Sequence, residues 1–317
     1  MNRLILIDGH ALLFRAFYAF PPLTTSQGEL VNAVYGFTSI LLTVIKELKP
    51  THLAVSFDLA APTFRHEAFK DYKAQRAETP KELIDQEARV RQVVTTLNLP
   101  IYEQAGFEAD DVIGTLAEQA KTKEVITTIV TGDLDALQLV DDDPQKGKGK
   151  VEVFIPARGK KPAITYDEKA VEDRFGGLEP EQLIDYKALA GDQSDNIPGV
   201  KGIGPKTAIQ LIKQFGSIEN LYQSLEDPKK MILSKKGSSL SDTIILKLIA
   251  GKESAFQSKH LATIIKNVPL RLDMKHCQVE NYDKEKVVQL FKELEFRSLI
   301  NKLPNDAFEQ QVQEVLF

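Results

Sequence analysis

Several features common in proteins are scarce or missing in this 317-residue chain. Its single cysteine, Cys277, excludes a disulfide framework and a cysteine-rich zinc site. The apolar stretch near its start, Leu4–Ile7, is too short for a signal peptide or a membrane span, and no later stretch is long enough and free of charge. These absences predict a cytoplasmic protein that does not enter a membrane.

The chain also has no tryptophan and no excess of positive charge. Its formal net charge of −5 excludes a uniformly basic nucleic-acid binder but not local basic patches. It lacks a Walker A motif for nucleoside triphosphates and a Gly-x-Ser-x-Gly nucleophile. What it does have, 43% hydrophobic and 27% charged residues, is typical of a folded protein and excludes disorder as the main state.

Apolar runs and amphipathic segments alternate in the first half of the chain. The predicted strands are 4–7, 53–57, 100–102 and 125–130. The predicted helices are 30–48, 80–97 and 109–120. A polar segment over 141–150 precedes a predicted hairpin of strands 151–155 and 163–165, and the sequence beyond Glu168 is mostly helical in pattern. This order predicts an α/β domain with a mostly parallel sheet and a helical part after it.

Aspartate follows three of the predicted strands, at the end where open α/β sheets carry their sites. Any one of these acids is most simply explained as a turn residue or a helix N-cap. Together, carboxylates that converge on one sheet edge repel each other and raise each other's pKa, so the cluster is reasonable only with cations bound. The nine candidates are Asp8, Asp58, Glu108, Asp110, Asp111, Asp133, Asp135, Asp192 and Asp195.

This cluster offers oxygen ligands only, without histidine or cysteine. Such ligands favour the hard cations Mg²⁺ or Mn²⁺. Two ions about 4 Å apart suit in-line displacement at phosphorus, because one activates a water and the other stabilises the leaving oxygen. The acids therefore predict a two-metal site for phosphodiester hydrolysis.

Two further segments have features of nucleic-acid contacts. The Gly-Ile-Gly sequence at 202–204 precedes a predicted helix, so its backbone N–H groups can approach phosphates. The same glycines fit a plain tight loop, but the flanking helical segments favour a helix–hairpin–helix element near 182–216 that contacts the DNA backbone. Residues 64–76 interleave aromatics with cations, as single-strand binders do, and they equally fit a solvated surface.

Several motifs occur in one order along nearly the whole chain. They are Asp8-Gly9-His10, Phe14-Arg15-Ala16-Phe17, Phe57-Asp58, Tyr72-Lys73-Ala74-Gln75-Arg76, Gly106–Asp111, Thr131–Asp135 and Gly191–Gly199. In this order they resemble the 5′-nuclease family, which includes the 5′-nuclease domains of bacterial DNA polymerase I, the phage 5′-exonucleases and the flap endonucleases. One departure is Leu134, since polymerase-I-type members usually carry lysine between these two aspartates.

The resemblance implies a fold in two parts. A PIN-like α/β nuclease core would cover residues 1–175, and a helical DNA-binding part would cover 176–317. A helical arch near 61–80 would span the active site and admit a single-stranded 5′ flap. The helix–hairpin–helix near 182–216 would bring Asp192 and Asp195 to the active site.

The resemblance also implies roles for individual residues. The first metal would be held, directly or through water, by Asp8, Asp58, Glu108, Asp110 and Asp111. The second metal would be held by Asp133, Asp135, Asp192 and Asp195. The catalytic cations would be Lys73, Arg76 and Arg15, of which we expect Lys73 and Arg76 to lie in solvent until DNA orders the arch. The DNA contacts would be Tyr72, Gly202, Gly204 and Lys206, with a K⁺ ion at the hairpin.

The implied activity is that of a structure-specific 5′-3′ exonuclease or flap endonuclease that uses two Mg²⁺ or Mn²⁺ ions in replication and repair. The implied substrates are DNA with a 5′ flap, overhang or nick, and RNA–DNA primer ends, bound by a monomer. Two alternatives remain open. A non-catalytic binder of branched DNA with the same fold predicts missing acids, and a PIN-like ribonuclease is typically smaller, without arch or hairpin.

Overall fold

A six-stranded sheet forms the centre of the computed structural model, which describes residues 2–142, 149–226 and 240–306. The strands are β1 (Arg3–Asp8), β2 (His52–Ser56), β3 (Ile101–Tyr102), β4 (Ile126–Val130), β5 (Val151–Ile155) and β6 (Ile164–Tyr166). Their order is β3-β2-β1-β4-β5-β6, and every pair is parallel except β5 with β6. The predicted parallel sheet and final hairpin are confirmed, while residues 143–148 of the predicted polar segment lie outside the described residues.

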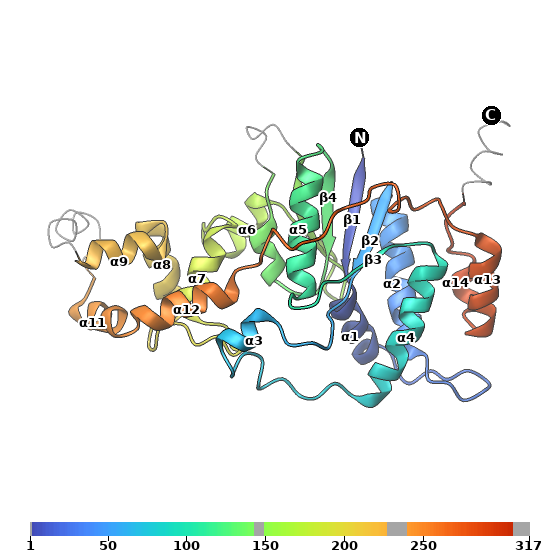
Figure 1. The fold of residues 1–317 in the computed structure, drawn as a ribbon, viewed down its shortest axis with the longest axis horizontal. Coiled ribbons are helices and arrows are strands. Elements are labelled where there is room, and N and C mark those ends of the chain that lie inside the picture. The colour runs from blue at the N-terminus through green and yellow to red at the C-terminus, as the bar shows by residue number, and fades with distance from the viewer. Residues whose placement is uncertain (1, 143–148, 227–239, 307–317) are drawn as a thin grey trace.

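Helices cover both faces of the sheet (Figure 1). Those of the first half are α1 (Gly9–Ala19), α2 (Asn32–Leu48), α4 (Lys81–Thr96), α5 (Ala109–Lys121) and the 3₁₀ helix η1 (Asp135–Leu139). Sequence analysis missed α1. It begins directly after β1, where the Asp8 carboxylate accepts a hydrogen bond from the Ala11 N–H and caps the first turn.

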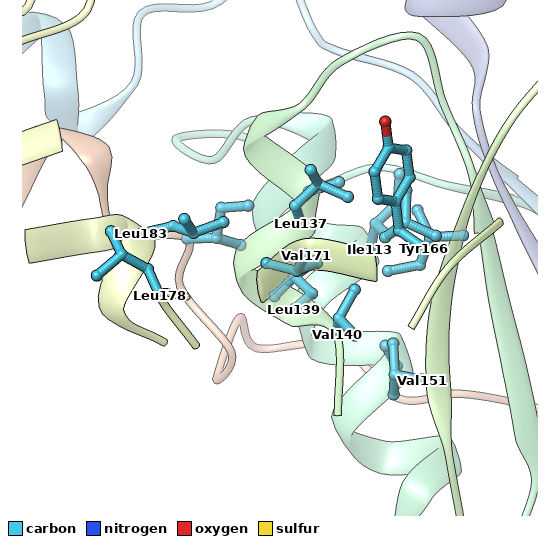
Figure 2. Packing of buried hydrophobic residues seen from close by; sticks show 14 of the residues in the cluster. Ile113, Leu137, Leu139, Val140, Val151, Tyr166, Val171, Leu178 and Leu183 are labelled. Carbon is cyan, nitrogen blue, oxygen red and sulfur yellow. The ribbon is translucent and has the colours of Figure 1, made fainter. Parts of the chain in front are cut away.

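Alternate side chains of β1 point into two separate hydrophobic clusters. Leu4 and Leu6 pack in the cluster beneath α5, and Ile5 and Ile7 pack against α1, α2 and α4. All four are at most 1% exposed, which explains why this strand is a continuous apolar run. Burial of each such side chain contributes about 1.5–3 kcal/mol. Figure 2 shows the cluster beneath α5, where residues of η1 meet Val171 and Leu178 from the following helical part.

The helical part lies to one side of the sheet (Figure 1). Its helices are α6 (Glu168–Arg174), α7 (Gln182–Ala190), α8 (Pro205–Phe215), α9 (Ile218–Glu226), α11 (Asp242–Ala250) and α12 (Lys252–Ala262). The cluster beneath α5 continues from Leu4 of β1 to Leu221 of α9, so the two parts share one core. The division at residue 175 therefore stays a prediction.

After α12 the chain crosses in front of α5 to the opposite side of the sheet, where α13 (Lys284–Glu293) and α14 (Arg297–Ile300) lie (Figure 1). Hydrogen bonds hold this crossing segment along its length. The Val268 N–H donates to Thr115 of α5 at 3.0 Å, and the Leu53 N–H of β2 donates to the carbonyl of Cys277 at 2.7 Å. None of the helices in the described residues has the length and apolarity needed to span a membrane.

The segment predicted as a helical arch, near 61–80, is helical only over α3 (Phe64–Ala68). Turns follow as far as Arg76, before α4 begins at Lys81. This segment joins β2 to α4 and passes beside α12 (Figure 1). Its conformation therefore depends on contacts with distant parts of the chain rather than on helical hydrogen bonds.

Candidate active site

The carboxyl ends of β1, β2 and β4 bring three of the predicted aspartates to one edge of the sheet. β1 pairs in parallel with both β2 and β4, so Asp8, Asp58 and Asp133 all follow strands that end there. Backbone and hydroxyl donors fix these carboxylates. Thr131 Oγ1 donates to Asp8 at 2.7 Å, and the Ala109 N–H donates to Asp58 at 2.8 Å.

The carboxylates of this edge are close enough to perturb one another's pKa. Burial is the largest cause that raises the pKa of Asp8 to about 6, and the charges of Asp58 and Asp133 raise it further. Burial, followed by the charges of Asp8 and Asp133, raises the pKa of Asp110 well above its usual range. The expected concentration of negative charge is therefore present.

Asp135 and Asp192 lie on either side of Lys187, a cation that sequence analysis missed. The Lys187 ammonium contacts Asp135 and donates to Asp192 at 2.6 Å. Burial raises the pKa of Asp135 to about 7 although Lys187 opposes it. At Asp192 burial is the largest single influence and raises the pKa, but Lys187 and the hydrogen bonds from Ser194 together lower it below its usual value. Lys187 thus supplies positive charge at Asp135, the residue after Leu134. The sequence feature that could have identified Lys187 is its place in the last turn of α7, five residues before Asp192.

The arch segment is docked onto this cluster through its cations and a tyrosine. Lys73 Nζ donates to Glu108 at 2.9 Å, and Arg76 pairs with Asp195 at 2.5 Å. The Tyr72 hydroxyl lies 3.1 Å from both of these carboxylates. The expectation that Lys73 lies in solvent is wrong, because its side chain is only 21% exposed, while that of Arg76 is half exposed.

Asn196 also holds the same segment, and sequence analysis assigned it no role. Its amide donates to the Asp71 carbonyl at 2.6 Å and accepts from Gln75 at 3.1 Å. Tyr72 packs beside Ile197 in a small apolar cluster. The loop that carries Asp192 and Asp195 is thereby joined to the arch segment.

Asp111, predicted as a metal ligand, lies in a buried network of hydrogen-bond donors. It is fully buried, and its carboxylate receives two 2.7 Å hydrogen bonds from Arg65. The N–H groups of Ile265 and Glu108 occupy it further, at 2.8 and 3.1 Å. Arg65 also donates to the carbonyl of Leu261 at 2.9 Å. Since these donors use its oxygens, Asp111 anchors the arch and the crossing segment, and its role as a metal ligand stays a prediction.

The remaining predicted residues lie around the cluster. Arg15, expected at a phosphate, donates to the carbonyls of Pro156 and Ala157 in the β5–β6 turn. Gly204 caps α8 with open space where a side chain would extend, and Lys206 is exposed in the first turn. Gly202, at φ +83°, lies against Lys247, whose ammonium donates to its carbonyl at 3.1 Å. The hairpin thus presents exposed backbone as the glycine pattern predicted.

The donor chemistry of the cluster fits hard divalent cations, because every candidate ligand is a carboxylate. In the described residues no three acidic, histidine or cysteine side chains are placed to hold a metal ion as they stand. The cations Lys73, Arg76 and Lys187 lie among the carboxylates and compensate their charge. Metal binding therefore requires these side chains to rearrange.

Comparison with known proteins agrees with this arrangement. The model for the N-terminal resolvase-like domain of 5′-3′ exonucleases matches residues 3–176, and the model for their C-terminal SAM fold matches residues 178–285. The chain belongs to the 5′-3′ exonuclease family. This membership confirms the family, the α/β nuclease fold and the nuclease class that the motifs predicted.

DNA polymerases I are among the relatives. The chain is 46% identical over 307 residues to DNA polymerase I of Chloroflexus aurantiacus, covering 95% of this chain and 31% of that protein. It is 41% identical over 310 residues to DNA polymerase I of Bacillus caldotenax, covering 98% and 33%. The chain thus spans about a third of the length of these relatives.

Among solved structures, the T5 D15 protein co-crystallised with metal ions superposes with a TM-score of 0.65 at 21% identity. The alignment covers 93% of this chain and 99% of that one. At this identity the similarity establishes the shared fold. The site residues themselves stay predictions.

Proposed function

We propose that this chain is a divalent-metal-dependent 5′-3′ exonuclease and flap endonuclease that hydrolyses DNA phosphodiester bonds. The observation that carries the proposal is the gathering of eight carboxylates from both family regions at one sheet edge. The proposed first-metal ligands are Asp8, Asp58, Glu108 and Asp110. The proposed second-metal ligands are Asp133, Asp135, Asp192 and Asp195. Family membership and T5 D15, whose structure is described with metal ions, support the metal.

Bound Mg²⁺ or Mn²⁺ ions supply an activated water and charge neutralisation at the leaving oxygen. The chain's own residues orient the substrate. Lys73 and Arg76 reach the cluster from the arch segment, where they attract the phosphate to be cleaved. The exposed N-terminus of α8 after Gly204 holds the duplex backbone, with Lys206 and a K⁺ ion beside it.

The proposed substrate is DNA with a 5′ flap, 5′ overhang or nick, including RNA–DNA primer ends, in replication and repair. The T5 D15 flap endonuclease, described in a pseudo-enzyme-product complex with DNA and metal ions, supports DNA as the ligand. Tyr72 is buried at the junction of arch and cluster, so we propose that it contacts DNA only after the arch moves. We propose a monomeric cytoplasmic enzyme.

The deciding experiment offers labelled 5′-flap DNA and single-stranded RNA of equal length to the wild-type protein with Mg²⁺, Mn²⁺ or EDTA. We expect cleavage of the flap DNA with either metal and none in EDTA. Cleavage of RNA alone would support the ribonuclease alternative, and binding of flap DNA without cleavage would support the non-catalytic one. Product length separates release of single nucleotides from cleavage at the flap junction.

A further inference from the structure

Three cations without carboxylate partners stand on the turn between β5 and β6. Arg158, Lys160 and Lys161 are exposed around Gly159, whose φ of +58° permits the tight turn. Within the described residues none of the three forms an ion pair. In a chain of net charge −5 this turn is a local excess of positive charge.

The turn is held in place from two sides. The backbones of Arg158 and Lys161 exchange hydrogen bonds of 2.9 and 3.0 Å. From α1, Arg15 donates to the Pro156 carbonyl at 2.9 Å and to that of Ala157. Because the backbone is already ordered, anion binding there costs little conformational entropy.

Arg15 adds a fourth cation to the group. Burial, and then the nearby charge of Arg158, lower the pKa of Arg15. Two guanidinium groups that repel each other gain when an anion comes between or beside them. A phosphate is the anion that arginine and lysine bind best in this way.

The turn between β5 and β6 leaves the sheet at the carboxyl ends of the parallel strands, where the carboxylates also lie. β5 is parallel to β4, and β4 to β1, so Ile155 ends on the same side as Asp8. Neighbouring strands are about 4.8 Å apart, which separates the ends of β5 and β1 by about 10 Å. Arg158, Lys160 and Lys161 lie three to six residues beyond Ile155, so their distance from the carboxylates is larger than this separation.

We infer that Arg15, Arg158, Lys160 and Lys161 form a phosphate-binding site, the β5–β6 site, for the DNA backbone at a position away from the cleaved bond. The inference rests on the proposed function and extends it to the path of the substrate. Contacts to phosphate position DNA without reading its sequence. Because Lys160 and Lys161 lie on the turn and outside the carboxylate cluster, they bind ground state and transition state equally, so loss of these two lysines raises KM and leaves kcat unchanged.

The test compares Lys160→Ala/Lys161→Ala with the control Lys46→Ala/Lys302→Ala. Both variants lose two exposed positive charges. Lys46 lies near the C-terminal end of α2, which leads into the amino end of β2, so it is at the ends of the strands opposite to the carboxylates. Binding of a fluorescent 5′-flap DNA is measured in EDTA between 50 and 200 mM KCl. We expect the slope of log K against log[KCl] to fall by about 2 for the β5–β6 variant only. Equal slopes for the two variants would overturn the site.

A second measurement places the contact along the strand. Neutral methylphosphonates replace single phosphates of the flap substrate one position at a time. We expect wild-type affinity to fall when the phosphate is replaced at one or two adjacent positions away from the cleaved bond, and Lys160→Ala/Lys161→Ala to show no further loss there. A uniform effect at every position would contradict a defined site. Failure of the wild-type protein to cleave flap DNA would instead refute the proposed function, independently of these slopes.

Discussion

At the scale of single residues, acids of similar sequence context have different environments. Asp110 and Asp111 are neighbours at the start of α5. Asp110 lies among other carboxylates, and its pKa rises, while the charge of Asp111 is paired with that of Arg65. Sequence analysis grouped the two because spacing alone does not show which side of the helix start holds a buried arginine.

The Arg65–Asp111 pair should stabilise the fold more than any exposed pair. We expect Arg65→Ala to lower the free energy of unfolding by about 3–5 kcal/mol, because Asp111 is left charged and buried without its partner. Urea unfolding measures this. Lys81→Ala, which breaks an exposed pair with Asp85, is the control and should cost at most about 0.5 kcal/mol. A similar small loss for both variants would contradict an anchoring role.

Lys73 is predicted to act on the rate of cleavage. We expect Lys73→Ala to lower kcat about 10²-fold, the scale for loss of one preorganised electrostatic donor. Single-turnover cleavage of flap DNA at saturating enzyme measures it, with Lys70→Ala, an exposed lysine of the same segment, as control. Rates equal to wild type in both variants would return Lys73 to a role in docking the arch.

Lys187 is predicted to compete with a divalent cation. Removing its charge in Lys187→Met should tighten Mn²⁺ binding several-fold, because Asp135 and Asp192 lose a tethered cation. Mn²⁺ titration followed by electron paramagnetic resonance measures this without any substrate. Lys259→Met is a matched control, since Lys259 also bridges two carboxylates, Asp185 and Glu219. Weaker Mn²⁺ binding in Lys187→Met would show that the ammonium orients the ligands instead.

At the scale of elements, the sequence predicted best what depends on local pattern. Buried strands are apolar runs, and α8 begins with Gly204 and Pro205, which suit an N-cap and a first turn. The docking of the arch was not predictable in this way. Lys73 meets Glu108 and Asp195, which are 35 and more than 100 positions away, and no local pattern encodes such pairs.

The hairpin before α8 should bind duplex DNA through its backbone. Gly204→Leu should keep its melting temperature, because a side chain there meets open space, and should weaken duplex binding about tenfold by keeping phosphates away from the N–H groups. Fluorescence anisotropy with duplex and with single-stranded DNA measures the effect, and the single strand serves as control. Gly202 is unsuitable for this test, since its positive φ and contact with Lys247 make any substitution disruptive. Unchanged duplex affinity would assign duplex binding to another element.

At the scale of the whole molecule, the carboxylate cluster should govern how stability depends on pH. The pKa values of Asp8 and Asp135, about 6 and 7, exceed the unfolded value near 3.8, so the folded state binds more protons between about pH 4 and pH 7. Stability without metal therefore falls as pH rises through this window. His10 acts in the same direction, because its pKa is also raised. Burial is the largest single influence and lowers that pKa, but Glu87, Asp58 and Asp8 together raise it.

We therefore expect a lower melting temperature at pH 8 than at pH 5.5 in EDTA. Added Mg²⁺ should restore much of the lost stability at pH 8, by about 2.7 kcal/mol when its concentration is 100 times its dissociation constant. At pH 5.5 it should restore little, because protons compete for the same carboxylate oxygens. Thermal unfolding gives the melting temperature at both pH values, with and without Mg²⁺. Equal stabilisation by Mg²⁺ at both values would indicate binding outside the cluster.

The crossing segment after α12 limits how this protein can be divided into fragments. It runs from the helical part, along α5, to the edge of β2, and α13 then packs beside α4. A fragment that stops at residue 176, where the first family model ends, loses Ile264, which packs on Gly114 of α5, and the partner of the β2 edge. The two family regions are therefore joined through a shared core and through the crossing segment, and a cut at residue 176 would uncover apolar surface on α5 and the free side of β2.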